Sequence, residues 1–300
     1  MRYRSASDEF RKRFGCKVYK LALSGGMTCP NRDGTLGDRG CIFCLHGSGD
    51  FAACGSSVAE QISLAKQRVS FKAQNAKYIA YFQSYTNTYA PTEKLRTLFS
   101  EAIAPEDVVA LSVGTRPDCL PDDVIALLSE INRKKPVMIE LGLQTVHPQT
   151  AAFIRRGYEL STYDNAVRRL KAAGLEVITH MILALPDETP EMIVKTARYI
   201  GQSGADGIKL QLLHILDGTD LADAWRAGQV PVLTMEEYLE VLGRCVEALP
   251  PVMVIHRLTG DGAKRSLLAP VWSADKKAVL AAVSRYFEEH DIQQGRNYKG

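Results

Sequence analysis

The hydrophobic pattern of the chain repeats six times between about residues 17 and 248. In each repeat, a short apolar run bounded by turn residues is followed by an amphipathic stretch, which is typical of alternating β-strands and α-helices. The expected strands span residues 17–23, 77–83, 108–113, 137–144, 175–185 and 207–216. The expected helices span residues 57–74, 92–102, 121–133, 161–173, 189–203 and 234–248.

Strands that are apolar on both faces, each followed by a helix, predict an α/β fold with a parallel sheet covered by helices. The pattern leaves open whether the sheet closes partly into a barrel or stays open and doubly wound. In both architectures ligands bind at the carboxyl ends of the strands. We therefore expect the loop after the first strand to enter the functional site.

The regular alternation of strands and helices ends after about residue 250. Residues 251–300 predict a C-terminal extension that contains one further strand, a glycine-rich basic loop and a helix over about 273–289. Residues 1–16 form an N-terminal segment before the first strand, and residues 17–250 form the main α/β unit. The extension is a candidate element on the substrate side.

Composition and charge narrow the classes of function. The chain has 37 Lys and Arg against 34 Asp and Glu, so a nucleic-acid partner would need a local basic patch. A dinucleotide or P-loop phosphate motif is absent. The first residues are charged throughout, and no apolar run approaches the ~18 residues that cross a bilayer. We expect a cytoplasmic protein without a membrane partner.

Four of the seven cysteines lie between residues 29 and 54. Cys29, Cys41 and Cys44 stand in the glycine-rich run CPNRDGTLGDRGCIFC, directly after the first strand. Three thiolates in one loop suit an iron–sulfur cluster whose fourth iron stays open to a ligand. The alternative is a closed zinc site with His46 or Cys54 as the fourth ligand. Spacing alone does not decide between them, but the position of the loop favours the cluster.

Five motifs together resemble the radical S-adenosylmethionine (SAM) superfamily. They are CPNRDGTLGDRGCIFC, YFQSYTNTYAP, GTRPDCL, ELGLQTVHPQT and HMILALPDETP. Within that superfamily the chain is similar to the YhcC/YtqA-type group, which is related to the radical SAM domain of the Elongator catalytic subunit. The resemblance runs from about residue 15 to residue 275. The eleven residues between the first two cysteines depart from the usual three, although this group shares the longer spacing.

The resemblance implies a partial (β/α)6 radical SAM barrel with a 4Fe-4S cluster on Cys29, Cys41 and Cys44. It also implies reductive cleavage of SAM to a 5′-deoxyadenosyl radical, with an electron donor such as flavodoxin or ferredoxin. Phe43 matches the aromatic position near the adenine, and His180 matches a position that often touches the ribose. The remaining residues implied to hold SAM are Gln83, Ser84, Gln144, Arg156 and Pro186.

Glu140 has two interpretations. It lies four residues before Gln144 on the same strand, so both side chains point to the barrel interior. Because a buried carboxylate is rarely left unpaired, Glu140 either pairs with a barrel-lining Lys or Arg such as Lys209, or binds SAM or the substrate. The sequence leaves both interpretations open.

Basic side chains of the last strand and the extension are expected near the mouth of the barrel, where they either bind substrate or form a solvated surface. They are Lys209, His214, His256, Arg257, Lys264 and Arg265. Relatives that act on wobble uridines make RNA phosphate a reasonable ligand for them. The resemblance implies, in Gram-positive-type members, conversion of 5-carboxymethylaminomethyluridine to 5-aminomethyluridine at tRNA position 34, ahead of a separate methyltransferase. The alternatives are a radical enzyme acting on a small metabolite or peptide, and a zinc-stabilised barrel that binds RNA without catalysis.

Overall fold

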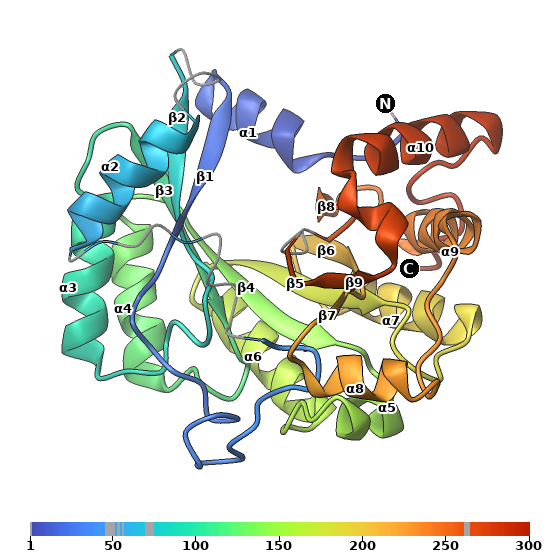
Figure 1. The fold of residues 1–300 in the computed structure, drawn as a ribbon. Helices are drawn as coiled ribbons and strands as arrows, with labels where there is room; N and C mark the ends of the chain where they lie inside the picture. The colour runs from blue at the N-terminus through green and yellow to red at the C-terminus, as the bar shows by residue number, and fades with distance from the viewer. Residues whose placement is uncertain (1, 46–51, 53–54, 56, 70–74, 261–264) are drawn as a thin grey trace.

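A seven-stranded parallel sheet forms the centre of the computed structural model, which describes residues 2–45, 52, 55, 57–69, 75–260 and 265–300 (Figure 1). The strand order is β1-β2-β3-β4-β5-β6-β8. The α/β barrel class is confirmed, and the further strand predicted after residue 250 joins the six strands of the main sheet as its seventh. The strands are β1 (Val18–Leu23), β2 (Lys77–Phe82), β3 (Val108–Thr115), β4 (Val137–Gln144), β5 (Glu176–Leu183), β6 (Gly207–Leu212) and β8 (Val254–Arg257).

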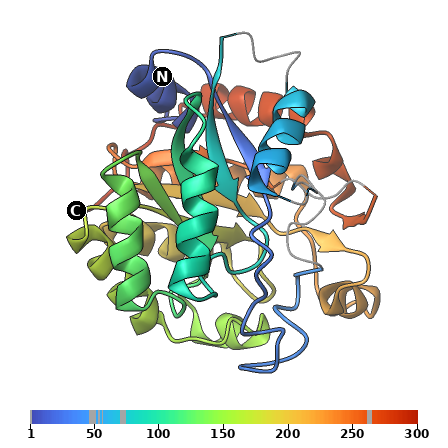
Figure 2. The same ribbon diagram turned by 90° about the vertical axis from the view of Figure 1, so that its left-hand side faces the viewer.

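Helices cover the outer face of the sheet, as the alternating pattern predicts; Figure 2 shows α3 and α4 lying over the strands. The helices that follow the strands are α2 (Val58–Val69), α3 (Thr92–Ile103), α4 (Asp122–Asn132), α6 (Leu160–Ala172), α7 (Pro190–Gln202) and α9 (Met235–Ala248). Residues 70–74, the predicted end of the first helix, lie outside the described residues. None of the helices in the described ranges is long and apolar enough to cross a membrane.

The predicted strand 207–216 is two strands. After β6, Leu213 still donates its backbone N–H to Leu183, and β7 (Ile215–Leu216) then pairs antiparallel with β9 (Leu267–Ala269) in a separate two-stranded sheet. Leu213 and Ile215 are both buried in one apolar cluster beside that small sheet. The apolar run therefore continues across the gap between β6 and β7, which is why the sequence pattern predicts a single strand.

The described residues form four further helices. The helix predicted over 273–289 is α10 (Lys276–Glu289), preceded by a 3-10 turn at Val271–Ala274. Three helices were not predicted: α1 (Ala6–Phe14), α5 (Pro148–Phe153) and α8 (Asp220–Arg226). Because β8 follows residue 250 and joins the main sheet, the chain beyond that residue contributes to the barrel itself. The proposed division into segments 1–16, 17–250 and 251–300 stays a prediction.

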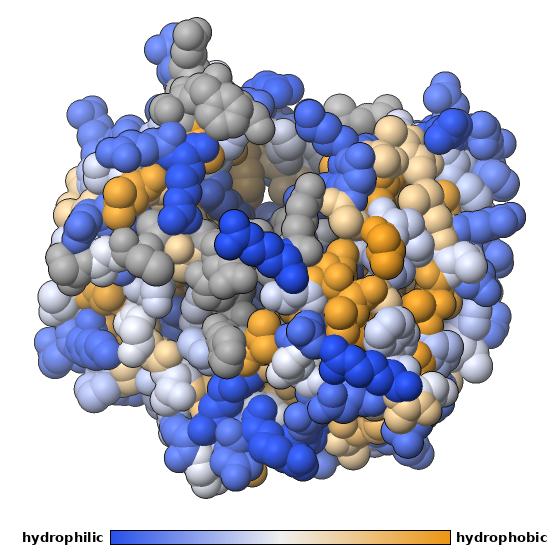
Figure 3. Space-filling model, viewed as in Figure 1, coloured by the Kyte–Doolittle hydropathy of each residue, from blue (hydrophilic) through white to orange (hydrophobic). Residues whose placement is uncertain are grey.

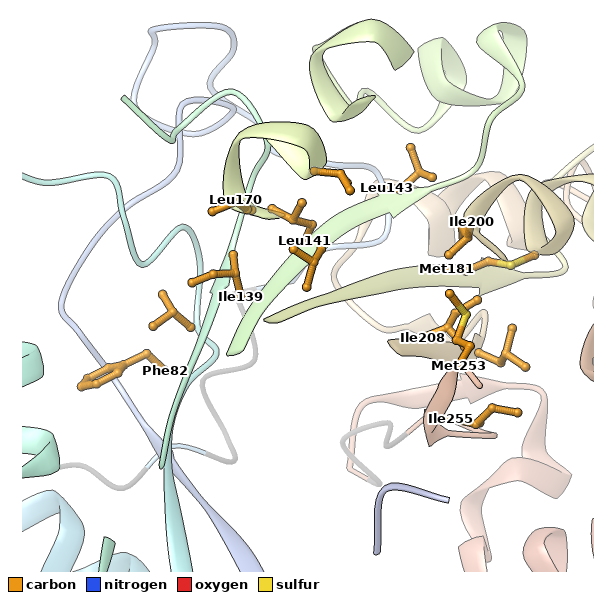
Figure 4. Close-up of a cluster of buried hydrophobic side chains, with 14 of the residues drawn as sticks. Phe82, Ile139, Leu141, Leu143, Leu170, Met181, Ile200, Ile208, Met253 and Ile255 are labelled. Atoms are coloured by element: carbon orange, nitrogen blue, oxygen red, sulfur yellow. The ribbon is translucent and has the colours of Figure 1, made fainter. Parts of the chain in front are cut away.

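Alternate residues of each strand face opposite sides of the sheet. On β4, Ile139, Leu141 and Leu143 point outwards toward the helices, where Leu170 of α6 lies beside them (Figure 4). The residues between them, such as Glu140, point into the barrel and line its cavity. The outward set forms the main hydrophobic core, and the inward set forms the candidate site.

The barrel interior has three levels from the amino to the carboxyl ends of the strands. The lowest level is apolar and packs against Ala6 and Phe10 of α1; it consists of Ile79, Ala110, Met138, Ile178 and Val254. The middle level is polar and includes Lys20, Tyr81, Ser112, Glu140, His180, Lys209 and Arg257. The upper level lies nearest the cysteine loop and includes Gln83, Gly114, Gly142 and Gln211.

Candidate functional site

A cavity of about 730 Å³ occupies the barrel interior between the cysteine loop and α1. Figure 3 shows the hollow in the face of the molecule, between the β1 side and the β8 side. Cys29, Cys41 and Cys44 all line the cavity, as do side chains from every strand of the main sheet. The loop after the first strand therefore does enter the interior.

The cysteine loop is held by backbone contacts within itself and by its neighbours. Arg32 and Asp33 donate backbone N–H groups to the carbonyl of Cys29, and Gly40 donates to the carbonyl of Asn31 at 2.6 Å. The Asn31 side-chain amide, 5% exposed, donates to the carbonyl of Arg155 at 2.7 Å and approaches the Cys41 Sγ at 3.4 Å. These contacts tie the loop to the segment that follows α5.

Cys29, Cys41 and Cys44 are the predicted ligands of the cluster, in which each cysteine binds a different iron. Among the described residues, no group of three or more His, Cys, Asp or Glu side chains is placed to hold one metal ion. Burial, with Cys44 nearby, raises the pKa of the Cys41 thiol to about 11. The alternative zinc ligands His46 and Cys54 lie outside the described residues.

Unsatisfied acceptors cluster at the carboxyl ends of β2 and β4. Ser84 Oγ, Asn87 Oδ1 and Gln144 Oε1 are buried and have no hydrogen-bond partner within the described part of the chain. Such atoms are costly unless a ligand or water supplies donors. Gln83 and Gln144 line the cavity, whereas Ser84 and Asn87 lie behind the lining. The ammonium of a bound amino acid such as the methionine part of SAM carries three donors, so Gln144 Oε1 fits that group.

The side chain of Arg156 uses most of its hydrogen-bond donors on backbone carbonyls of the fold. Four of its N–H groups point at backbone carbonyls: Nη1 donates to Leu143 and Thr145, while Nε and Nη2 donate to Tyr158. The residue is 4% exposed and holds the end of β4 to the segment after α5. Its guanidinium borders the cavity, but it has little capacity left for a ligand carboxylate. The SAM contact inferred for Arg156 stays a prediction.

Two loops lie where the adenine of SAM is predicted to bind. Phe43 lines the cavity and packs against an apolar cluster that includes Leu185, the residue before Pro186. Pro186 is buried in the turn after β5 and does not line the cavity. Ala184 and Asp187 flank this turn with φ of 67° and 62°, in the left-handed region that favours glycine. The turn thus has the backbone conformation that glycine favours, although neither residue is glycine.

Glu140 is the centre of the middle level. Its Oε1 accepts hydrogen bonds from Lys20 Nζ at 2.5 Å and Ser112 Oγ at 2.6 Å. Its Oε2 accepts from His180 Nε2 at 2.7 Å and from Lys209 Nζ. The ion pair with Lys209 agrees with the structural interpretation of Glu140, and Lys20 joins it.

The electrostatics of this level follow from burial and crowding. Burial alone would raise the pKa of the Glu140 carboxyl, but Lys20 and Lys209 lower it well below its usual range. Burial and the ammonium of Lys209 lower the pKa of His180 to about 4, so this imidazole is neutral and donates to Glu140. Burial also lowers the pKa of Lys209 to about 7, and the neighbouring Lys20 and Arg257 act in the same direction.

The predicted basic patch is divided between two places. Lys209 is 3% exposed and lies at the middle level, with His256 and Arg257 beside it in the cavity and not at the barrel mouth. His214 lines the cavity too, while Arg265 is exposed and outside it. Lys264 lies outside the described residues. The register explains the difference: Lys209 pairs with Arg257 and with His180, so these side chains share one level of the interior.

Sequence reasoning missed three residues that shape the site. Lys20 is a lone lysine in an apolar strand, which is a signal of a buried charge. Arg116 donates two hydrogen bonds to the Asp118 carboxylate, from Nε at 2.9 Å and from Nη2 at 2.7 Å. It also donates to the carbonyl of Arg156, close to the cysteine loop. Asn31, inside the cysteine motif, carries no pattern that would reveal its contact with Cys41.

Comparisons with known proteins identify the architecture. Residues 34–200 match the family model described as the Radical SAM superfamily, and residues 205–289 match the model of the Radical_SAM C-terminal domain. The chain is 41% identical over 300 residues to YtqA of Bacillus subtilis strain 168, a protein described as uncharacterized. That match covers 99% of this chain and 93% of YtqA.

Two further comparisons involve longer proteins. Over 189 residues, the chain is 26% identical to the tRNA uridine(34) acetyltransferase of Methanocaldococcus jannaschii, covering 62% of this chain and 34% of that protein. Among solved structures, the archaeal Elp3 of Methanocaldococcus infernus, with residues 1–46 deleted, has a TM-score of 0.70 at 19% identity. It covers 92% of this chain and 64% of the Elp3 chain, and the likeness is one of fold.

Proposed function

This chain belongs to the radical SAM superfamily, and from that membership we propose that it cleaves SAM reductively to modify a wobble uridine of tRNA. It is an enzyme of that superfamily, and membership implies a 4Fe-4S cluster and SAM as cofactors. When bound, these groups supply a 5′-deoxyadenosyl radical after one-electron reduction by a donor such as flavodoxin or ferredoxin, and the radical takes a hydrogen atom from the substrate.

The observation that carries the proposal is the juxtaposition of three cysteines and the unsatisfied acceptor Gln144 Oε1 on a single cavity. Cys29, Cys41 and Cys44 hold the cluster in this assignment, and Gln144 Oε1 accepts from the SAM ammonium, whereas Ser84 lies behind the lining. Glycines at positions 114 and 142 keep the space between them open, since a side chain at 142 would meet the Gln144 amide at 2.9 Å. The cavity volume leaves room for a substrate base beyond the cofactor.

The tRNA assignment has a separate basis. The match to a relative whose name specifies uridine 34 of tRNA covers 62% of this chain, at 26% identity. The proposed reaction converts 5-carboxymethylaminomethyluridine and water to 5-aminomethyluridine and glyoxylate. SAM is the two-electron oxidant of the carboxymethyl carbon and leaves as methionine and 5′-deoxyadenosine. A separate methyltransferase then acts on the product. The target base would be turned out of the anticodon stack and into the barrel. Radical chemistry on a small metabolite or peptide is the second candidate, because the cavity is also large enough for such a molecule.

The cluster is tested first. Protein purified without oxygen is expected to be brown and, once reduced, to release 5′-deoxyadenosine from SAM. Replacing Cys29, Cys41 or Cys44 by Ala abolishes both properties. Cys16→Ala is the matched control, because Cys16 is half-buried like the three but lies before β1. Zinc at full occupancy after anaerobic reconstitution with iron and sulfide would contradict the proposal and support the non-catalytic alternative.

The substrate is tested in cells. A strain without the protein is expected to accumulate 5-carboxymethylaminomethyluridine in its tRNA and to lose 5-aminomethyl-type nucleosides, as measured by mass spectrometry of digested tRNA. The wild-type gene restores the pattern and the Cys41→Ala variant does not. Unchanged nucleosides in the deletion strain would exclude this tRNA reaction and support the small-substrate candidate.

A further inference from the structure

The side-chain amide of Asn31 lies between two acceptors that meet at the cysteine loop. Its Nδ2 donates to the carbonyl of Arg155 at 2.7 Å and lies 3.4 Å from the Sγ of Cys41. The same sulfur lies 3.7 Å from the Arg155 carbonyl, to which the free thiol donates. Once Cys41 binds iron it has lost its S–H proton, so the sulfur and the carbonyl face each other as two acceptors. The Asn31 amide is then the donor that both of them share.

The amide has one N–H group available for the sulfur. A side-chain amide carries two N–H donors, and the short contact with Arg155 uses one of them. The Arg156 carbonyl is a further acceptor, 3.3 Å from Nδ2, but it already accepts from Arg116 Nη1 at 2.9 Å. A thiolate is charged and attracts a donor more strongly than a neutral carbonyl does. The second N–H of Asn31 is therefore directed to Cys41.

The backbone around this amide fixes its position. Arg155 and Gly157 adopt φ of 56° and 81°, in the left-handed region that glycine tolerates best. A Cβ at position 157 would lie 2.8 Å from Asn31 Oδ1, so the amide fits only because residue 157 has no side chain. Asn31 is 5% exposed, and its backbone carbonyl accepts from the N–H of Gly40, the residue before Cys41. The amide is thus held from both sides.

A hydrogen bond to a ligand sulfur changes the reduction potential of an iron–sulfur cluster. Reduction adds one negative charge to the cluster and its sulfurs. A donor on a sulfur therefore interacts more strongly with the reduced state than with the oxidised state, which raises the potential. Because Asn31 is buried, water screens this interaction weakly.

We propose that Asn31 raises the reduction potential of the cluster through its hydrogen bond to Cys41, and so eases the transfer of the first electron. The charged side chain nearby is less suited to this role, because Arg116 directs Nε and Nη2 to the carboxylate of Asp118, which offsets its charge. The inference rests on the cluster of the proposed function and is independent of the tRNA substrate.

The first test is a redox titration of the reconstituted protein without SAM, in which the reduced cluster is quantified by electron paramagnetic resonance. Asn31→Leu keeps the approximate size of the side chain and removes the donor. At a fixed potential, the ratio of reduced to oxidised cluster is expected to fall about tenfold in this variant, which equals a shift of about 60 mV for one electron. A midpoint equal to that of wild type would overturn the proposal.

The matched control is Thr35→Val, in the same loop. This substitution also keeps the size of the side chain and removes one hydrogen bond, between Thr35 Oγ1 and the hydroxyl of Tyr89 at 3.0 Å. The midpoint of Thr35→Val is expected to stay at the wild-type value. An equal fall in both variants would show that the potential follows the integrity of the loop, and would refute the role of the amide.

A spectroscopic measurement on wild type does not depend on whether Asn31→Leu assembles a cluster. Asparagine labelled with ¹⁵N in the side-chain amide is incorporated, and pulsed electron paramagnetic resonance of the reduced cluster measures its magnetic coupling to that nitrogen. All asparagines of the chain lie in the described ranges, and within these ranges Asn31 alone has a hydrogen bond to a cysteine sulfur. A ¹⁵N coupling is expected in wild type and in Thr35→Val. Its absence in wild type would overturn the proposal.

Failure of the proposed function gives a different result from failure of this inference. Wild-type protein that holds no iron–sulfur cluster after anaerobic reconstitution contradicts the proposed function, and the inference with it. A cluster that assembles in wild type, but shows no ¹⁵N coupling or keeps its midpoint in Asn31→Leu, leaves the proposed function intact and overturns the inference alone.

Discussion

Lys209 makes the stability of this protein depend on pH in a direction that can be worked out. Its pKa is about 7 in the folded state, against about 10.5 for an ordinary lysine. Between these values the unfolded chain holds a proton that the folded chain has lost, so the unfolded state binds more protons and stability rises with pH. The gain approaches about 1.4 kcal/mol for each pH unit once Lys209 is deprotonated in the folded state. From pH 7 to pH 9 the sum is about 2 kcal/mol.

The variant Lys209→Met isolates this contribution, because it keeps the length of the side chain and removes the titrating group. Glu140 keeps Lys20, Ser112 and His180 as partners in the variant. The free energy of unfolding is measured in urea at pH 7 and pH 9 on protein prepared without oxygen. Wild type should gain about 2 kcal/mol relative to Lys209→Met over this range. Lys134→Met, at a lysine whose side chain is 60% exposed, should follow wild type. Parallel changes in wild type and Lys209→Met would refute the reasoning.

Two further predictions concern the edges of the site. Arg156→Ala removes the side-chain donors of the Thr145 and Tyr158 carbonyls, while the Leu143 carbonyl keeps the Thr145 N–H, so the substitution should lower the free energy of unfolding by about 3 kcal/mol in urea titrations. Unchanged stability together with lost SAM affinity would show that Arg156 binds the cofactor. Ala184→Gly should raise the free energy of unfolding by about 0.5 kcal/mol or more, because Ala184 adopts a φ of 67° that glycine tolerates without strain. A lower thermal midpoint for Ala184→Gly would show that the turn is not strained.

The fold was largely predictable because each strand and helix has its own signal. Strand β4, for example, is apolar enough to be recognised as a strand buried on both faces, and its bounds Val137–Gln144 agree with the prediction. Helix α1 was missed since only Ala6 and Phe10 of its residues are buried, too few for an apolar stripe. Helix α8 was missed for the same reason: it is seven residues long and buries two of them.

The site was predictable in its parts but not in its arrangement. The cysteine spacing identified the loop, and an acid inside a strand identified Glu140. Lys209 was named as a candidate partner of Glu140, but Lys20 and His180 were not, because the alignment of their strands is recorded by no local pattern. For that reason Lys209 and Arg257 were placed at the mouth of the barrel, although strand pairing sets them at the middle level.

Helix α1 determines how the barrel is closed. In the described sheet β1 and β8 are its two ends and do not pair with each other. Instead, α1 and the segment before it cross the seam: Ile255 of β8 donates its backbone N–H to the carbonyl of Arg4 at 2.8 Å, and Phe10 of α1 packs with Val18 and Val254. Paired strands are held about 4.8 Å apart by their hydrogen bonds. Across this seam the circumference of the barrel is set by side-chain packing, which makes it the part of the wall that can widen without breaking a ladder of backbone hydrogen bonds.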